Sequence, residues 1–299
     1  MTSLDNYFVS TAWLEEHLDD ESVRIVDATV LYDPSQDEND PGYLNTGEPG
    51  YLDQHIPGAV FADLFELNEA DAEVPFTFSD PQAFAEKIQE LGIGSADTTT
   101  IIYDRGALVG IDLPSNFWAS RLAWQLRVIG VTNVKILDGG FQKWILEERP
   151  LASGPESYPA SSFQPHFDEK LIADDRDLQA SIGDSQTLII DCLSPQQYAG
   201  EDNPYGEDKA GHIPSSKNIF FAGLNDFETG TLIEPEKIKQ QFEEIGALDP
   251  DKEIIAYCGF GIAATWIQYL LQALGQDQVK VYDGSLNDWH NKNLPVVKP

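Results

Sequence analysis

The sequence predicts an α/β protein with two tandem domains, each a mainly parallel sheet flanked by helices. Two observations support this prediction: four segments return in the same order in the second half, and short apolar runs alternate with stretches of helical periodicity. Strand–helix alternation of this kind is typical of parallel sheets covered by helices on both faces. The length of 299 residues also suits two domains of about 150 residues each better than one.

The repeated segments make the duplication visible along the chain. The pairs are residues 23–29 and 188–193, 54–59 and 211–216, 100–104 and 254–258, and 134–144 and 279–289. Their spacing drifts, as differences in loop length would produce, while their order stays the same. Trp144 and Trp289 close the last pair, and we expect both to be core anchors.

Helical periodicity and linker composition give the expected domain limits. Residues 115–129 and 263–274 carry apolar residues at helical spacing, and each stretch ends close to a glycine. Residues 149–165 are rich in Pro and Ser, which is typical of an extended linker. We therefore expect domains over residues 1–148 and 171–299, with a linker over residues 149–170.

The charge and composition exclude several classes of protein. The formal net charge is −33, from 51 Asp plus Glu against 18 Lys plus Arg, which disfavours binding to nucleic acid or to anionic membranes. Such acidity indicates a solvated shell, suited to a saline habitat, or a surface for a basic protein partner. No apolar run approaches the ~20 residues of a membrane span, and the N-terminus lacks the pattern of a secretory signal.

Two cysteines and five histidines give neither a disulfide framework nor zinc-ligand spacing. We therefore expect a cytoplasmic protein with no metal or cofactor.

The chemistry is expected where the repeated strands 100–104 and 254–258 end. They differ at their last residues, Asp104 and Cys258, and ligands of open α/β sheets bind at the carboxyl ends of strands. After Cys258 a glycine-containing loop leads into a helix, so backbone N–H groups should converge on the sulfur and favour its thiolate. This loop comprises Gly259, Phe260, Gly261, Ile262, Ala263 and Ala264.

The run Cys-Gly-Phe-Gly-Ile-Ala-Ala at 258–264 resembles the active loop of the rhodanese and mercaptopyruvate sulfurtransferase family. The tandem arrangement, the His-Ile-Pro motifs and the Asp-Gly-x-x-x-x-Trp motifs at 138–144 and 283–289 are similar as well. The resemblance implies two rhodanese-like domains, of which only the second carries the cysteine. It also implies transfer of sulfane sulfur through a Cys258 persulfide, from a thiosulfate or 3-mercaptopyruvate donor to a thiol or cyanide acceptor. A thioredoxin-like reductant is a further candidate partner, and the internal duplication favours a monomer.

The sequence departs from this family around the reactive sulfur. The family usually has an Arg where Leu193 stands, and no Arg occurs after Arg176. Members of known type carry basic residues in the loop or a Ser in place of Phe260, and a rough alignment puts Phe65 and Phe76 at the positions of an Asp and a His. We therefore expect an apolar pocket in which Lys209 or Arg105 reaches in from a rim. The donor is then a weakly bound thiosulfate or mercapto acid, or a bulkier or protein-bound persulfide.

Other polar residues near the repeated motifs are expected to support the loop. His55 and His212 are interpreted as braces of their His-Ile-Pro turns, with catalysis as the alternative. Asp191 and Asp283 are interpreted as acceptors that fix loops. Cys192 is either a buried thiol or a partner for a resolving disulfide with Cys258.

Two other functions remain open at this stage. A cysteine-dependent phosphatase or arsenate reductase can share this fold, but its loop typically ends in an Arg that clamps the substrate, and Ala263 and Ala264 stand there. A noncatalytic interaction module is the second alternative. The cysteine lies in the loop that is best suited to activate it, and this argues against an interaction module.

Overall fold

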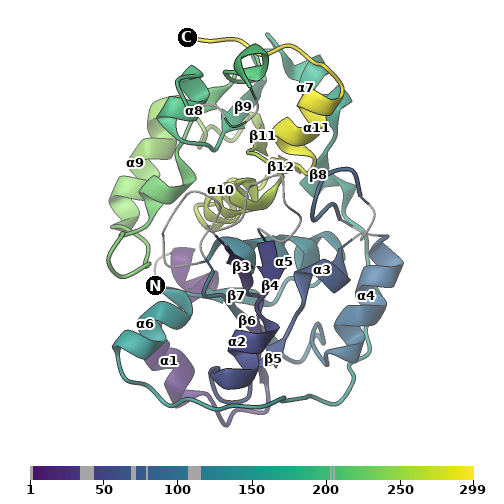
Figure 1. Cartoon of the computed structure of the whole chain (residues 1–299), viewed down its shortest axis with the longest axis vertical. Coiled ribbons are helices and arrows are strands. Elements are labelled where there is room, and N and C mark those ends of the chain that lie inside the picture. The colour runs from purple at the N-terminus through teal and green to yellow at the C-terminus, as the bar shows by residue number, and fades with distance from the viewer. Residues whose placement is uncertain are drawn as a thin grey trace. The chain divides into compact units, whose positions relative to one another are not determined.

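The computed structural model forms two compact units (Figure 1). It describes residues 3–33, 44–68, 72–78, 80–106, 116–202, 204 and 206–299. The first unit takes its described residues from Met1–Ala70, Phe78–Phe167 and Asp226–Leu232, and the second from Asp71–Thr77, Asp168–Asn225 and Ile233–Pro299. Each half of the chain thus contributes one short segment to the unit built mainly by the other half.

The first unit contains a five-stranded sheet in which all neighbouring strands are parallel. Its order is β1–β7–β6–β2–β5, with bounds Phe8–Val9, Val134–Leu137, Thr99–Tyr103, Val23–Asp27 and Val60–Phe61. A separate antiparallel pair joins β3 (Val30–Tyr32) to β4 (Leu44–Thr46). The helices are α1 (Thr11–Glu16), α2 (Glu48–Asp53), α3 (Leu64–Leu67), α4 (Pro81–Glu90), α5 (Phe117–Val128) and α6 (Gly140–Leu146), with a 3-10 turn over Ser3–Asn6.

The second unit repeats this arrangement. Its parallel sheet has the order β10–β9–β11–β12–β8, with bounds Lys217–Asn218, Thr187–Asp191, Glu253–Tyr257, Val279–Tyr282 and Ile172–Ala173. The helices are α7 (Asp175–Ser181), α8 (Pro195–Ala199), α9 (Pro235–Ile245), α10 (Ile262–Ala273) and α11 (Ser285–Asn291), with 3-10 turns over Glu169–Leu171, Glu207–Lys209 and Phe221–Leu224. The predicted fold class, two tandem α/β domains with mainly parallel sheets, is confirmed.

Buried apolar strands and two almost fully buried helices form the cores. The central strands β6 and β11 are buried along nearly their whole length, as strands covered on both faces should be. Helices α5 and α10 match the predicted stretches 115–129 and 263–274, although Ser115 lies outside the described residues. Both helices are buried on nearly all sides, although α5 includes Arg121 and Gln125 among its buried residues. None of the described helices is long and apolar enough to span a bilayer.

The two tryptophans of the last repeated motif anchor equivalent places in the two cores. Trp144 and Trp289 are fully buried, and their indole N–H groups donate to the carbonyl oxygens of Pro150 (2.8 Å) and Pro295 (2.9 Å). A buried indole requires such a partner for its N–H group. The duplication therefore extends to single side-chain hydrogen bonds.

The segment predicted as a linker is ordered along the first unit up to Phe167. The Tyr158 hydroxyl donates to the carbonyl of Gly58 (2.6 Å) and accepts from the N–H of Ile25 (3.1 Å). Gly92 has φ +74°, and a Cβ atom there would lie 2.5 Å from the Cβ of Tyr158. Only glycine fits this close approach, so the connection is packed against the first unit rather than loose.

The repeated aspartates at the ends of β2 and β9 have different partners. Asp27 is fully buried, and its carboxylate pairs with the Arg105 guanidinium at 2.7 Å. That guanidinium also donates to the carbonyl of Gln54 and lies over the ring of Phe141. In the second unit Gly259 occupies the position equivalent to Arg105, so Asp191 has no equivalent ion pair. Removing one partner of a buried pair leaves an uncompensated charge, and Arg105 therefore has a structural role.

We expect Arg105→Met to lower the free energy of unfolding by about 3–5 kcal/mol, because it leaves the Asp27 carboxylate in the core without its cationic partner. Urea unfolding followed by tryptophan fluorescence measures the loss. Lys237→Met is the matched control, since its pair with Glu234 is exposed and should change stability by no more than about 1 kcal/mol. Equal small losses in both variants would contradict this assignment.

Candidate active site

Cys258 lies between a central strand and a buried helix of the second unit. It directly follows β11 and precedes α10, and its side chain is 3% exposed. Gly261 caps the helix at φ +83°, a left-handed conformation that glycine adopts without strain. The first N–H groups of any helix have no acceptor within the helix. The chain thus brings the sulfur to the positive end of the α10 dipole.

The first unit shows what this arrangement can bind. Asp104 occupies the position equivalent to Cys258, and its carboxylate accepts the N–H of Ala119 on α5 (2.8 Å) and the N–H of Gly106 (3.2 Å). Burial raises the pKa of Asp104 to about 7, and the backbone donors partly oppose this rise. By the repeat, the equivalent donors around Cys258 are the N–H groups of Phe260 and Ala264. The strand–loop–helix unit is therefore a cradle for an anion.

A serine that the sequence interpretation did not single out lies against Cys258. The backbone N–H of Cys258 donates to the Ser285 hydroxyl oxygen at 3.0 Å, and that oxygen lies 3.9 Å from the cysteine sulfur. The Ser285 hydroxyl also reaches the carbonyl oxygen of Tyr282 at 2.8 Å. Its single proton can therefore point either to this carbonyl or to a charged sulfur.

The repeat contained a signal for Ser285. Its φ is +50°, and the equivalent Gly140 of the first unit has φ +53°. A left-handed conformation is costly for a residue with a Cβ atom, so serine in place of glycine indicates a use for its hydroxyl. The change from Asp-Gly-Gly to Asp-Gly-Ser between the two motifs is readable in the sequence.

Asp191 fixes the neighbouring strand end as a buried acceptor. Its carboxylate accepts the N–H of Leu193 at 2.8 Å and the hydroxyl of Tyr257 at 2.6 Å. Burial raises the pKa of Asp191 to about 6, and these two hydrogen bonds oppose the rise. Leu193 stands where the family usually has an Arg, and it contacts Asp191 through its backbone N–H.

The remaining predicted support residues make contacts with groups other than Cys258 or lie at the ends of neighbouring elements. The imidazole of His212 stacks on the ring of Tyr198 (3.7 Å between centroids) and its Nδ1 lies 2.9 Å from the Tyr198 carbonyl oxygen. His55 repeats this contact with Tyr51 at 2.8 Å. These contacts agree with the interpretation of both histidines as braces of their turns. Asp283 follows β12 directly, and Lys209 ends a 3-10 turn.

Arg105 was expected to reach the sulfur site from a rim, and the structure shows its partners within the first unit. Its guanidinium is held in the first unit by Asp27 and by backbone carbonyl oxygens. The charge of the buried Asp27 carboxylate, which the sequence analysis had not paired with Arg105, accounts for the position of this guanidinium. Phe65 also belongs to the first unit, on α3, whereas Phe76 belongs to the second.

Cys192 is the first residue after β9 and is a free, fully buried thiol. Burial raises the pKa of the Cys192 thiol well above its usual range, which suppresses its reactivity. Cys258 is free as well. Within the described part of the chain, no group of three or more His, Cys, Asp and Glu side chains could hold a metal ion.

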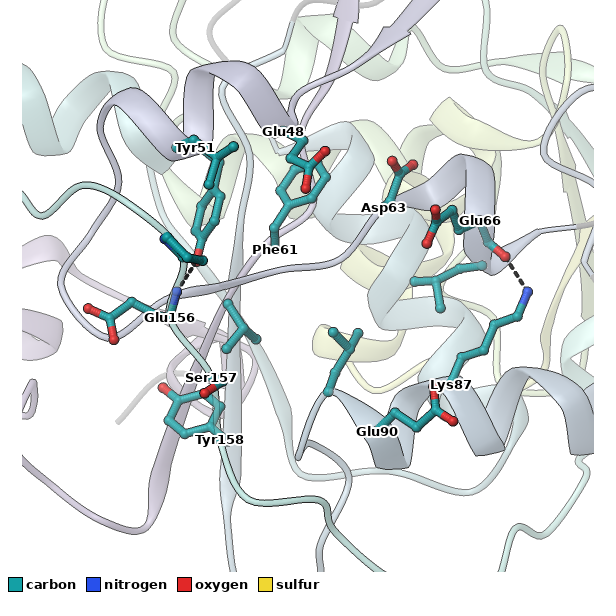
Figure 2. A pocket seen from close by; sticks show the side chains of 15 residues that line it. Glu48, Tyr51, Phe61, Asp63, Glu66, Lys87, Glu90, Glu156, Ser157 and Tyr158 are labelled. Atoms are coloured by element: carbon teal, nitrogen blue, oxygen red, sulfur yellow. Dashed lines mark hydrogen bonds between the residues drawn. The ribbon is translucent and has the colours of Figure 1, made fainter.

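A cavity of about 480 Å³ lies in the first unit, and Figure 2 shows the side chains that line it. In this view Lys87 reaches the backbone oxygen of Glu66, and the Tyr51 hydroxyl accepts the N–H of Glu156 at 2.9 Å. The lining is acidic and aromatic, with Glu48, Asp63, Glu66, Glu90 and Glu156 beside Tyr51, Phe61 and Tyr158. Carboxylates repel anions, and the lining residues include no cysteine, so this cavity does not suit an anionic sulfur donor.

Comparison with known proteins agrees with this geometry. The model of the rhodanese-like domain matches the chain twice, over residues 10–147 and 174–292. The 3-mercaptopyruvate sulfurtransferase of Escherichia coli is 32% identical over 97% of both chains. The sulfur carrier protein TtuD of Thermus thermophilus is 33% identical over 97% of this chain and 96% of its own.

A similar solved structure comes from the same family. The crystal structure of the 3-mercaptopyruvate sulfotransferase SseA of Escherichia coli matches with a TM-score of 0.76 and 30% identity, covering 94% of this chain and 98% of that chain. The repeated family match covers most of the sequence, and the two sheets have the same strand order. The chain therefore belongs to the rhodanese family and carries two tandem rhodanese-like domains.

Proposed function

We propose that this chain is a sulfurtransferase that carries sulfane sulfur as a persulfide on Cys258. The observation that carries the proposal is the position of Cys258: a nucleophile stands where the first unit holds the Asp104 carboxylate among backbone N–H groups. A persulfide is also an anion, and the same cradle suits it. The named functions of the relatives, 3-mercaptopyruvate sulfurtransferase and sulfur carrier protein, support the same class of reaction.

The reaction has two balanced halves. In the first, the Cys258 thiolate attacks the outer sulfur of the donor, a new S–S bond forms, and the bond to the rest of the donor breaks. Thiosulfate leaves as sulfite. 3-Mercaptopyruvate leaves as the enolate of pyruvate, which takes the proton of the transferred sulfur. In the second half, a thiol or cyanide attacks the terminal sulfur and the Cys258 thiolate is regenerated.

The residues around Cys258 stabilise the charged sulfur in this scheme. Backbone N–H groups at the start of α10 and the dipole of that helix act before any donor arrives, so they need no reorganisation during the reaction. The Ser285 hydroxyl adds a donor that can turn toward the sulfur. The N–H of Leu286 and the amide of Asn287 hold the carbonyls of Cys258 and Gly259 at 2.9–3.0 Å, which keeps the loop in place.

The localisation, oligomeric state and partners of the enzyme are inferred from general features of the sequence. We infer a monomeric cytoplasmic enzyme, with a thioredoxin-like reductant as one candidate acceptor that brings its own thiol. The strong net negative charge argues against nucleic acid and anionic membranes as partners. A phosphatase would need a cationic clamp at the end of the loop, and no Arg follows Arg176 in the sequence.

Exposure to thiosulfate, 3-mercaptopyruvate or polysulfide should add one sulfur atom, about 32 Da, to the protein at Cys258. Intact-mass analysis before and after treatment with cyanide measures the gain and its loss. Cys258→Ser should abolish the gain. Cys192→Ser, the matched control, should retain it, because the Cys192 thiol is buried and protonated. Sulfur that persists in Cys258→Ser would contradict the proposal.

Ser285→Gly should separate stability from reactivity. The variant restores the residue found at the equivalent Gly140, so relief of the backbone strain at φ +50° offsets the loss of the acceptor for the Cys258 N–H, and the midpoint of unfolding should stay nearly unchanged. Loss of the hydroxyl should slow iodoacetamide alkylation of Cys258 at neutral pH by about two- to tenfold, the worth of one hydrogen bond. Alkylation that is unchanged or faster would remove Ser285 from the site.

A further inference from the structure

Two phenylalanine rings lie beside the loop that carries Cys258. The rings of Phe260 and Phe76 are stacked, with 6.4 Å between centroids and 27° between planes. Phe260 is the second residue after Cys258, and Phe76 comes from the first half of the chain but belongs to the second unit. Phe76 is buried, whereas Phe260 remains partly accessible. The loop therefore presents an aromatic face that has a second ring behind it.

The backbone of Phe76 indicates that its ring has a use. Residues Val74 to Thr77 form a turn in which the Thr77 N–H and hydroxyl donate to the Val74 carbonyl at 3.3 and 2.7 Å. Pro75 stands at the second position and Phe76, with φ +62°, at the third. Turns with a positive φ at this position normally carry glycine or asparagine there. A bulky aromatic residue in this conformation is a genuine outlier, and such strain is typical of functional sites.

The charges of the second unit do not favour a dianion at this loop. The loop has no basic residue, and no Arg follows Arg176. Several lysines of the unit have partners elsewhere: Lys280 pairs with Glu253, Lys292 with Asp175 and Asp288, and Lys217 donates to the Ile245 carbonyl. The formal net charge of −33 slows the approach of any anion, and of a dianion more than of a monoanion.

From these observations we infer the donor class of the site: a sulfur donor with at most one negative charge, whose sulfane sulfur is bonded to a sulfur atom that bears an apolar, preferably aromatic, group. This inference rests on the proposed function. The Phe260–Phe76 pair binds the apolar group, and backbone N–H groups receive the single charge. Phe260 and Phe76 are thus specificity-determining residues, and thiosulfate is a poor donor for this chain.

Benzenethiosulfonate is the probe for this class. The Cys258 thiolate attacks its sulfane sulfur, the bond between the two sulfur atoms of the probe breaks, and benzenesulfinate leaves with the electron pair. Thiosulfate delivers the same atom to the same cysteine and leaves as sulfite. No oxidant or reductant is needed in either case, and cyanide then converts each persulfide to thiocyanate, which is measured.

The experiment compares kcat/KM for the two donors with cyanide as acceptor. We expect the intact chain to prefer benzenethiosulfonate. Phe260→Ser should reduce the ratio of benzenethiosulfonate to thiosulfate by about two- to tenfold, the range typical of an aromatic pair. Phe260→Lys should reduce it further by assisting the dianion. Phe167→Ser, an exposed phenylalanine of the first unit, is the control and should leave the ratio unchanged.

Phe76→Gly tests the second ring without disturbing the turn. Glycine suits the positive φ of this position, so the turn can persist while the ring is lost, and the midpoint of thermal unfolding reports any loss of packing. The donor ratio should fall as in Phe260→Ser. A purely structural ring would change the unfolding midpoint and leave the ratio as it was, which would overturn the role of Phe76.

The outcomes separate this inference from the proposed function. If neither donor, nor polysulfide, adds sulfur to Cys258, the sulfurtransferase proposal itself fails. If thiosulfate is preferred, or if the ratio does not respond to Phe260→Ser, the enzyme stands and the donor class inferred here is wrong.

Discussion

The structure depends on one electrostatic arrangement that is built twice: a parallel strand ends, the chain turns tightly, and a helix begins with its N–H groups directed at the turn. Helix geometry leaves those groups without internal acceptors, so an anion at that point satisfies them. In the first unit the Asp104 carboxylate does so at 2.8 Å from the Ala119 nitrogen. In the second unit Cys258 takes the same position. The duplication therefore allows a carboxylate and a thiol to be compared at the same position of the fold.

Two side chains in left-handed conformations make contacts at Cys258 and its loop. Ser285 has φ +50° where its counterpart is glycine, and Phe76 has φ +62° in a turn that favours glycine. Each conformation costs roughly 1–2 kcal/mol for a residue with a Cβ atom. Each makes a contact with Cys258 or its loop: Ser285 with the Cys258 N–H, and Phe76 with the Phe260 ring. Ser215 and Asn293 of the second unit also have positive φ, so the contacts with Cys258 and its loop, rather than the strain alone, relate Ser285 and Phe76 to the site.

The sequence was sufficient for the elements that depend on periodicity. The repeated strands, the two buried helices and the glycine loop after Cys258 could be predicted, because alternation and apolar spacing are local signals. The exchange of residues 72–77 and 226–232 between the two units could not. These segments are short and have no repeating pattern, and the unit to which they belong is set by tertiary packing.

The ion-pair partners of the charged residues could not be predicted from the sequence either. Arg105 was expected to reach the sulfur site from a rim. Its actual partner, Asp27, lies on the neighbouring strand β2. Which carboxylate an arginine meets depends on strand register and on burial, neither of which a single sequence displays. Ser285, by contrast, was readable as a departure of one motif from its copy.

The second unit has Gly259 in place of Arg105, and this difference affects both the stability of the unit and the surroundings of Cys258. Where the first unit has Arg105 against Asp27, the second has Gly259, which lets the loop curl around the sulfur without a bulky side chain. Asp191 is then left with two uncharged donors, and its pKa is raised to about 6. A carboxyl group with a raised pKa holds its proton more tightly in the folded state, so its ionisation weakens the fold as pH rises from about 4 through 6. At neutral pH the second unit therefore carries a buried carboxylate at some cost in stability. In return, the loop over residues 259–264 carries no basic residue that would bind a small dianion, and in the donor class that we infer the aromatic face of Phe260 takes the place of such a cation.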